Sequence, residues 1–492
     1  MMVSSSDALV AARAKYEPVI GLEVHVQLLT ASKIFCSCST RFGAPPNSNV
    51  CPVCLGLPGA LPVLNRKAVE FAVLAGMALN CRINETSIFA RKNYFYPDLP
   101  KGYQISQYDK PLAEFGCIDI KSADRAKKIN ITRLHLEEDA GKSLHEGFPE
   151  ADKKTAVDLN RTGVPLIEIV SEPDISSPEE AYEYLTRLRE IILYTGVSDC
   201  NMEEGSLRCD ANVSVRPRGQ KELGTKTEVK NVNSFRFIRE ALEYEIDRQI
   251  EVLDSGGRVS QETRLYSANE GRTYGMRSKE QAHDYRYFPE PDLLPLVVDA
   301  QWRSAIAREL PELPEARRAR MVTDYGISDK DAVVLTVSRS RADQFEEAAK
   351  AAKNPKRVAN LVQSELMGRL KAKGIDLEDS PISMKGVAVS SDLVESGAIS
   401  GKILKDLYDL CFERSQDFPE VYEKEKPQQI TDAAAIEQIV DQVLAQNPKQ
   451  LEQYRAGKTT MLGFFVGQVM KLSKGQANPK LVNELLAKKL GS

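Results

Sequence analysis

Residues 20–28 read Ile-Gly-Leu-Glu-Val-His-Val-Gln-Leu, and this stretch decides the fold. Its even positions are all apolar, whereas Glu23, His25 and Gln27 stand at odd positions. Because successive side chains of a β-strand point to opposite faces, the alternation predicts a strand with one buried face and one polar face. A strand face in contact with water needs only polar side chains and does not require a glutamate next to a histidine. The polar face is therefore a candidate functional site.

Three further stretches before residue 300 alternate in the same way: residues 133–137, 207–216 and 226–230. An antiparallel sheet with one face in water would account for such strands without any function. The residue types instead favour chemistry, because His lies beside Glu, Asp beside Arg and Lys beside Glu. The polar residues concerned are Arg133, His135, Glu137, Arg208, Asp210, Asn212, Ser214, Arg216, Lys226, Glu228 and Lys230.

Glu168 stands in a strand that is otherwise apolar, Leu166-Ile-Glu-Ile-Val170. A carboxylate in such surroundings needs a partner. A salt bridge to Arg161 or Arg208 is the structural explanation, and a magnesium ion is the functional one, since magnesium prefers oxygen ligands. Because the sequence has no glycine-rich phosphate loop, a bound nucleotide would be held by side chains and a divalent cation. The carboxylates available for such a cation are Glu23, Glu137, Glu138, Glu168 and Asp210.

The pattern changes from strands to helices near residue 300. A chain of 492 residues should hold two to four domains, at roughly 100 to 200 residues each. Asn354 followed by Pro355 is typical of a helix N-terminus, and apolar residues then recur at helical spacing. A second break falls near Phe418, Pro419 and the stretch from Lys424 to Pro427. We therefore predict an α+β fold in three parts: an antiparallel-sheet domain at residues 1–300 and all-helical domains at 301–423 and 424–492.

The C-terminal end is basic although the whole chain is not. Lys and Arg number 66 against 70 Asp and Glu, a net charge of −4, but residues 455–492 hold seven basic residues and one acidic residue. This asymmetry predicts that the tail contacts a polyanion while the rest of the chain works at a distance from it. A solvated helix surface is the alternative. The candidate contacts are Lys458, Lys471, Lys474 and Lys480.

The sequence indicates neither export nor a membrane partner. Its longest apolar run, about residues 71–79, is far short of the roughly 18 to 20 residues that cross a bilayer. The N-terminus lacks a charged-then-apolar signal pattern. Nine cysteines at irregular spacing are unlike a secreted disulfide framework. We therefore expect a cytoplasmic protein.

Four of the cysteines form two close pairs. Cys36 and Cys38 are followed, after twelve residues, by Cys51 and Cys54. Zinc binds four thiolates tetrahedrally with bonds of about 2.3 Å, and two short pairs close such a site without strain. No histidine is nearby and no ligand position is left open, so the pattern predicts a structural zinc knuckle at residues 36–54. Four unliganded buried thiols are the alternative.

Taken together, several longer strings closely resemble the B subunits of glutamyl/aspartyl-tRNA amidotransferases. Two examples are Arg91-Lys-Asn-Tyr-Phe-Tyr-Pro-Asp98 and Asp284-Tyr-Arg-Tyr-Phe-Pro-Glu-Pro-Asp292. The resemblance runs from about residue 17 to the C-terminus, and its strings are long, ordered and specific to that family. The others are residues 20–26, 134–142, 160–170, 203–212, 463–470 and 474–479.

That resemblance implies an N-terminal cradle built on an antiparallel sheet similar to the catalytic domain of glutamine synthetase, and a helical C-terminal part whose tail grips tRNA. It also implies a ligase that uses ATP and magnesium. The family phosphorylates the side-chain carboxylate of Glu misacylated onto tRNA(Gln), or of Asp on tRNA(Asn), and ammonia then displaces the phosphate. A separate amidase subunit, A, makes the ammonia from glutamine, and a small C subunit completes a heterotrimer.

Carried over residue by residue, the resemblance implies a magnesium site with Glu23 beside it. Lys92 and Glu137 match positions at the mouth of the ammonia path. The zinc knuckle occurs in only some members of the family, which favours a structural role. The magnesium ligands implied in this sequence are His25, Glu137 and Glu168.

The charges that phosphoryl transfer develops need neutralisation by cations as well as by a metal. Lys230 lies on a predicted polar strand face, as do Arg208 and Asp210. We therefore place Asp210 and Lys230 among the catalytic residues, and Arg161 and Arg208 among those that contact the nucleotide.

Two other functions fit parts of the sequence. A tRNA-binding factor without catalysis would keep the basic tail but would need no intact set of acids and histidine. A stand-alone ligase for a free amino acid would use the cradle but would need no polyanion-binding tail. The sequence leaves open whether tRNA(Gln), tRNA(Asn) or both are served.

Overall fold

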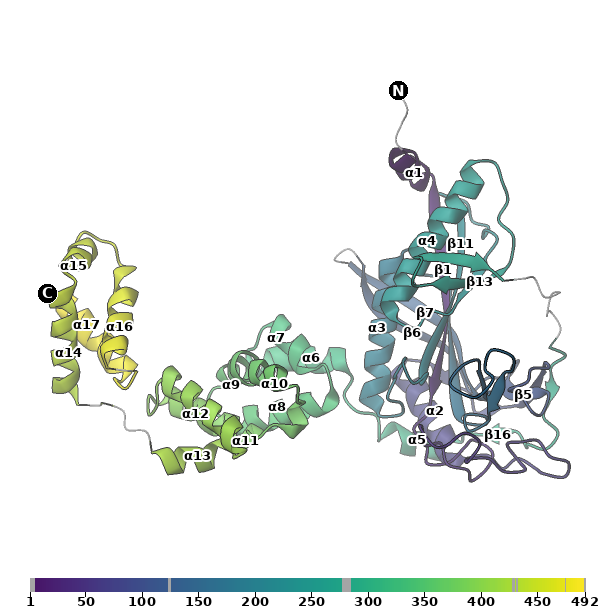
Figure 1. Ribbon diagram of the computed structural model, residues 1–492, viewed down its shortest axis with the longest axis horizontal. Coiled ribbons are helices and arrows are strands. Elements are labelled where there is room, and N and C mark those ends of the chain that lie inside the picture. The colour runs from purple at the N-terminus through teal and green to yellow at the C-terminus, as the bar shows by residue number, and fades with distance from the viewer. Residues whose placement is uncertain are drawn as a thin grey trace. The chain divides into compact units, whose positions relative to one another are not determined.

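The computed structural model describes residues 5–122, 125–276, 285–426, 430, 432–473 and 475–490 (Figure 1). The chain divides into two compact units, Met1–Leu313 and Pro314–Ser492. Within the described residues, every named strand belongs to the first unit, and the second unit is built of helices.

A nine-stranded sheet forms the centre of the first unit. All its strand pairs are antiparallel except β12 with β13, which run parallel. The four alternating stretches of the sequence, together with the apolar stretch that contains Glu168, become five adjacent strands of this sheet, from β12 to β7. In spatial order the nine are β14 (Arg272–Gly275), β13 (Thr263–Ser267), β12 (Thr227–Lys230), β11 (Leu207–Pro217), β1 (Tyr16–Gln27), β10 (Pro165–Ser171), β7 (Arg125–Glu138), β6 (Ala113–Ser122) and β2 (Arg82–Ile83).

Helices cover one face of this sheet. The even-numbered residues of β1 from Ile20 to Val26 are buried in one apolar core with α3 (Pro178–Thr195) and α4 (Phe235–Asp254), which lie alongside the sheet in Figure 1. Helix α2 (Arg66–Ala78) joins the same core. Burying side chains of this size contributes about 1.5–3 kcal/mol each. The odd-numbered side chains of β1 consequently point away from the helices.

Local sequence sets the ends of α3. The side chain of Ser177 accepts a hydrogen bond from the amide of Glu180, and Pro178 stands in the first turn. Gly196 ends the helix with φ at 70°, in the left-handed region that glycine adopts without steric cost.

A three-stranded sheet lies over part of the polar face. Its strands are β15 (Phe288–Pro289), β4 (Phe89–Asn93) and β5 (Tyr103–Gln107). The hydroxyl of Ser106 donates to Glu137 Oε2 at 3.0 Å, and Gln104 Nε2 donates to the carbonyl of Glu138 at 2.7 Å. In Figure 1, β5 lies on the opposite side of the large sheet from α3. The polar face is therefore partly covered rather than fully open to water.

Shorter elements complete the first unit. They are α1 (Ser5–Arg13), α5 (Ala300–Ala307), the strand pair β16 (Leu296–Val297) with β3 (Thr86–Ser87), and the pair β8 (Lys142–Leu144) with β9 (Ala156–Asp158).

The second unit contains two apolar clusters, one formed by residues between 321 and 421 and one by residues between 436 and 490. As predicted, Asn354 caps α9 by accepting a hydrogen bond from the amide of Arg357, and Pro355 opens the helix. Its elements are α6 (Pro314–Tyr325), α7 (Asp329–Leu335), α8 (Arg339–Ala351), α9 (Pro355–Leu361), η1 (Val362–Leu366), α10 (Met367–Lys373), η2 (Leu377–Asp379), α11 (Met384–Glu395), α12 (Gly401–Arg414), α13 (Phe418–Glu425), α14 (Ala433–Gln446), α15 (Pro448–Arg455), α16 (Met461–Leu472) and α17 (Pro479–Leu490).

Near the predicted second break, α12 ends at Arg414 and α13 begins at Phe418, whose amide donates to the side chain of the N-cap residue Asp417. Phe418 is buried in the first of the two clusters. Residue 427, at the end of the predicted break, lies outside the described residues. None of the helices in the described residues is both long and apolar enough to span a bilayer. The fold is thus mixed α and β, with a large, mainly antiparallel sheet followed by a helical region, as the alternation and the later helical spacing predicted.

Candidate functional site

The strand register brings four polar side chains into one row across the sheet. His25 of β1 is paired with Glu168 of β10 on one side and with Arg208 of β11 on the other. Glu168 is in turn paired with His135 of β7. Directly paired residues of neighbouring strands point to the same face. The row therefore lies on the polar face, away from the helices.

The histidine of β1 lies among three carboxylates. Its Nε2 is 3.4 Å from Glu168 Oε2, 3.5 Å from Glu23 Oε1 and 3.8 Å from Glu137 Oε1. The ligand atoms of His25, Glu137 and Glu168 all lie within 4.8 Å of one another, and so do those of Glu23, His25 and Asp210. We call these five residues the acidic cluster. The structure thus brings together the residues to which the resemblance assigned magnesium.

Burial and mutual charge set the protonation of the acidic cluster. Burial raises the pKa of Glu23, and the negative charge of Glu168 adds to the effect. Burial alone would lower the pKa of His25, but the hydrogen bond and charge of Glu168, with Glu137 and Glu23, raise it to about 9. Burial would raise the pKa of Glu168, yet His135 and His25 hold it well below its usual range.

His25 and His135, with Lys92, thus favour the ionised forms of the closely spaced Glu137 and Glu168. A carboxylate-rich donor set of this kind fits a hard divalent cation such as magnesium. The observed strand pairing already places three carboxylates around His25, close enough to bind one cation.

Two residues of β7 belong to the site although the sequence analysis gave neither a role. Nε2 of His135 lies 3.6 Å from Glu137 Oε2 and 3.7 Å from Glu168 Oε2, and Nη2 of Arg133 lies 3.5 Å from Glu168 Oε1. His135 Nδ1 and Arg133 Nε are buried and find no hydrogen-bond partner among the described residues. The polar alternation of residues 133–137 was the available signal.

Lys92 of β4 approaches the acidic cluster from the smaller sheet. Its Nζ lies 5.0 Å from the centroid of the Tyr285 ring. Burial alone would lower the pKa of Lys92, but the charge of Glu137, with contributions from Tyr287 and Glu168, raises it above its ordinary value. Lys92 and Glu137, which the resemblance places at the mouth of the ammonia path, thus lie close enough for their charges to interact.

Asp210 and Lys230 form an ion pair at the other side of β1. Asp210 is paired with Glu23 in the sheet, and its Oδ2 lies 2.7 Å from Lys230 Nζ. The same ammonium lies 3.1 Å from Glu228 Oε1. The Lys230 cation thus stands beside the acidic cluster.

Arg161 and Arg208 meet at Asp139, a buried acid that the sequence analysis did not single out. Arg208 Nη2 lies 2.9 Å from Asp139 Oδ1, and Arg161 Nε lies 3.6 Å from Oδ2. Arg161 also donates to the carbonyls of Ala140 at 2.9 Å and Gly141 at 2.6 Å. Neither of these two arginines pairs with Glu168, whose ion pair is formed with Arg133 instead.

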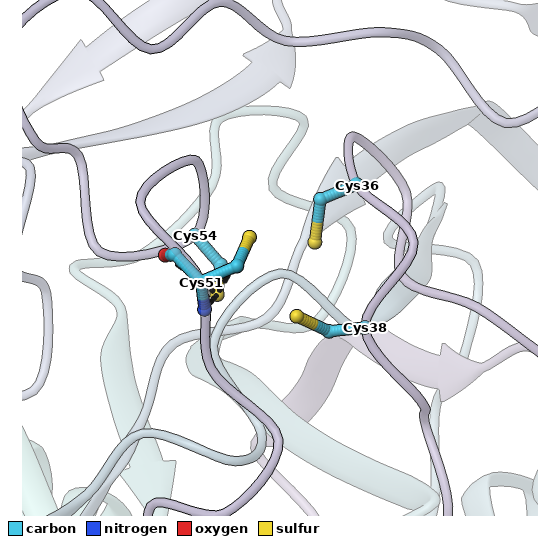
Figure 2. Close-up of side chains that lie close together, drawn as sticks. All are labelled: Cys36, Cys38, Cys51 and Cys54. Carbon is cyan, nitrogen blue, oxygen red and sulfur yellow. Dashed lines mark hydrogen bonds between the residues drawn. The ribbon is translucent and has the colours of Figure 1, made fainter.

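The four predicted zinc ligands come together between two loops (Figure 2). Their sulfur atoms all lie within 4.8 Å of one another, and those of Cys51 and Cys54 are 3.9 Å apart. Tetrahedral zinc with bonds of about 2.3 Å separates its sulfurs by about 3.8 Å. The hydrogen bond between Cys36 and Cys54 lowers the pKa of Cys54 and raises that of Cys36. The spacing of the four sulfurs therefore fits a tetrahedral metal site in which all four ligands are thiolates.

The basic candidates of the tail lie on the surface of the second unit. Lys458 follows α15, Lys471 is in the last turn of α16, and Lys480 is in the first turn of α17; all three are exposed. Lys474 lies outside the described residues.

Comparison with known proteins gives a family for both units. Residues 18–304 match the family model described as the GatB/GatE catalytic domain, and residues 343–490 match that of the GatB domain. The chain is 58% identical over 477 residues to the B subunit of the aspartyl/glutamyl-tRNA(Asn/Gln) amidotransferase of Carboxydothermus hydrogenoformans, covering 97% of this chain and 99% of the relative.

Two further relatives carry the same name. The protein of Solidesulfovibrio magneticus is 56% identical, with 97% of this chain and 100% of the relative covered. That of Geobacter sulfurreducens is 54% identical, with 96% and 99% covered. With both units matched and more than half of all residues identical over nearly the full length, this chain belongs to the B-subunit family of tRNA-dependent aspartyl/glutamyl-tRNA(Asn/Gln) amidotransferases.

Proposed function

We propose that this chain activates the side-chain carboxylate of Glu-tRNA(Gln) or Asp-tRNA(Asn) with ATP and converts it to the amide, giving Gln-tRNA(Gln) or Asn-tRNA(Asn). The observation that carries the proposal is the acidic cluster on the polar face of the sheet. Its spacing suits a divalent cation, and the relatives of this chain are named for amidation of these two aminoacyl-tRNAs.

The chemistry has two steps. A carboxylate is unreactive towards ammonia until one of its oxygens becomes a leaving group. In the first step that oxygen attacks the γ-phosphorus of ATP, the bond to the β-phosphate oxygen breaks, and ADP leaves. In the second, ammonia attacks the acyl carbon, inorganic phosphate departs with the C–O electron pair, and a proton is lost from nitrogen.

The side chains of the polar face would serve these steps by holding charge. His25, Glu137 and Glu168 would bind magnesium, with Glu23 beside them; magnesium would neutralise the charge of the transferred phosphoryl group. Asp210 would orient Lys230, whose ammonium would add positive charge.

The arginines would contact the nucleotide phosphates to different extents. Arg208 is paired in the sheet with His25 and would reach the phosphates from the row of polar side chains. Arg161 donates to two backbone carbonyls and would act mainly by fixing Asp139.

The rest of the proposal concerns partners and architecture. Ammonia would come from an amidase A subunit, passing Lys92 and Glu137, and a small C subunit would complete a heterotrimer in the cytoplasm. Residues 1–300 would form a cradle similar to that of glutamine synthetase, 301–423 a helical domain, and 424–492 a tail that binds tRNA through Lys458, Lys471, Lys474 and Lys480. Zinc on Cys36, Cys38, Cys51 and Cys54 would be structural.

The test is phosphate release from ATP in the presence of misacylated tRNA and the partner subunits. Glu168→Gln keeps the shape of the side chain but removes the charge that a hard cation requires, and His25→Ala removes a ligand. Each should slow phosphate release at least a hundredfold, at about 1.4 kcal/mol per factor of ten, with tRNA binding retained.

Glu179→Gln is the matched control, because Glu179 is an exposed acid in the first turn of α3. It should leave the rate unchanged. Near wild-type turnover in both Glu168→Gln and His25→Ala would reject the metal assignment. A wild-type protein that binds tRNA but shows no ATP-dependent turnover would instead support a binding factor without catalysis.

A further inference from the structure

Lys33 is a lysine with no exposed surface, although it lies only three residues before the first knuckle cysteine. Its Nζ donates to the carbonyl of Asn49 at 2.7 Å and lies 3.4 Å from that of Leu159. Its third neighbour is Cys54 Sγ, at 3.6 Å. The ammonium is therefore enclosed by two carbonyl groups and one sulfur.

A buried ammonium is unfavourable unless a negative charge compensates it. In the part of the chain that the structure describes, no carboxylate forms an ion pair with Lys33. Two acids line the same cavity as Lys33, and both have other partners: Glu138 pairs with Lys101, and Asp292 pairs with Arg91. The compensating charge must come from the cysteine sulfurs, and zinc held by four thiolates carries a net charge of −2.

Lys33 also occupies the point where the two cysteine pairs meet. Its backbone amide donates to the carbonyl of Cys38 at 2.9 Å, while its side chain reaches Cys54 of the other pair. Gly163 lies against both residues: a Cβ there would be in ordinary contact with them, 3.5 Å from Lys33 Cδ and 3.6 Å from Cys54 Cβ. Its φ of 82°, rather than a lack of space, is what favours glycine at this position.

We propose that Lys33 is the positioning residue of the zinc site, holding Cys54 by an N–H···S hydrogen bond and supplying the positive charge that a tetrathiolate zinc lacks. The proposal rests on the zinc site described under the proposed function. Partners of this kind around a metal ligand typically change metal affinity 10- to 100-fold when they are removed.

The carbonyl of Leu159 extends the arrangement towards the sheet. The chain from residue 159 leads through Gly163, whose carbonyl accepts from the amide of Ile34 at 2.9 Å, into β10. Lys33 therefore connects the knuckle with the segment that precedes the strand carrying Glu168.

The experiment compares Lys33→Met, which keeps an unbranched chain but no charge, with Lys33→Arg and with Lys110→Met, a matched change at an exposed lysine of the same unit. Protein purified without chelator is assayed for zinc per chain and for the rate of zinc transfer to a chelating dye. We expect Lys33→Met to release zinc at least ten times faster than the wild type. Lys33→Arg should lie in between, and Lys110→Met should match the wild type.

If Lys33 only stabilises the fold, the result would be different. Lys33→Met would then lower the thermal midpoints of the zinc-loaded and zinc-free forms equally. If Lys33 acts on the zinc site, Lys33→Met lowers the midpoint of the zinc-loaded form more. Release within twofold of the wild type, or equal losses in both forms, overturns the role of Lys33 while leaving the zinc site intact. A wild type that carries no zinc overturns both.

A measurement on the wild type covers the case in which Lys33→Met does not fold. Reductive methylation followed by peptide mapping should leave Lys33 unmodified in the zinc-loaded protein and modify it at least fivefold more after zinc is removed. Equal modification of Lys33 in both forms rejects the proposal.

Discussion

In the proposed zinc site each knuckle cysteine would supply one of four sulfur ligands, so that a single substitution would open the site. Cys51→Ser should reduce zinc from about one per chain and lower the thermal midpoint, because the free energy of metal binding is part of the free energy of folding. Metal analysis and thermal unfolding of the purified protein measure the two effects.

Cys117→Ser is the control for this substitution, since Cys117 is a partly buried cysteine of the same unit outside the zinc set. It should keep its zinc. Activity lost in Cys51→Ser at unchanged stability would contradict a structural metal and indicate a catalytic one.

Single residues also show how far sequence reasoning reaches. The face of β1 that carries Glu23 and His25 could be predicted, because alternation within one strand fixes which side chains share a side. The position of His135 beside Glu168 could not, since it depends on which strands are neighbours and in what register. Asp139 was missed for the same reason: its partners Arg161 and Arg208 come from segments far along the chain.

Among the elements, α4 contacts the β12–β14 edge of the large sheet through one buried acid, Glu245. Glu245 accepts hydrogen bonds from the hydroxyls of Thr227 on β12 and Thr273 on β14, both at 2.9 Å. Its Oε2 also lies 3.2 Å from Arg264 Nε on β13. One carboxylate therefore connects three strands, including the parallel pair that alternation alone did not reveal.

Removing this charge should destabilise the first unit in a pH-dependent way. Burial would raise the pKa of Glu245, but Arg248 and Gln249 outweigh it and hold the pKa below its ordinary 4.5. Because this pKa is lowered, the ionised carboxylate of Glu245 contributes its full stabilisation of the folded state above about pH 4.5, and this contribution is lost as the pH falls further. Glu245→Gln should cost about 3 kcal/mol at pH 7 and progressively less below pH 4.5.

Urea unfolding at pH 7 and at pH 3.5 measures that difference. Glu251→Gln, an exposed acid on the same helix, should change the free energy of unfolding by less than about 0.5 kcal/mol at either pH. A cost for Glu245→Gln that is equal at both pH values would show that shape rather than charge matters there.

For the whole molecule, the contrast between a nearly neutral chain and a basic end predicts where a polyanion binds. Replacing Lys458, Lys471 and Lys480 together by Ala should weaken tRNA binding. It should also flatten the dependence of log affinity on log salt by about 1 for each tRNA phosphate that a lysine no longer neutralises. Filter binding or fluorescence titration across a salt series measures both.

A triple alanine variant at Lys330, Lys371 and Lys385, exposed lysines elsewhere in the second unit, is the control. It should keep the wild-type slope. An unchanged slope in the tail variant would show that its lysines only face solvent.

The position of β1 in the sheet has a consequence for synthesis on the ribosome. β1 is made near the start of the chain, yet both strands that flank it, β10 and β11, begin only at residues 165 and 207. Until then neither backbone edge of β1 has its strand partner, and the core helices α3 and α4 have not been made. Pairing over such separations makes folding slow and leaves the nascent chain prone to aggregation. Production of active protein should therefore depend on chaperones and on slow, cool expression more than its final stability suggests.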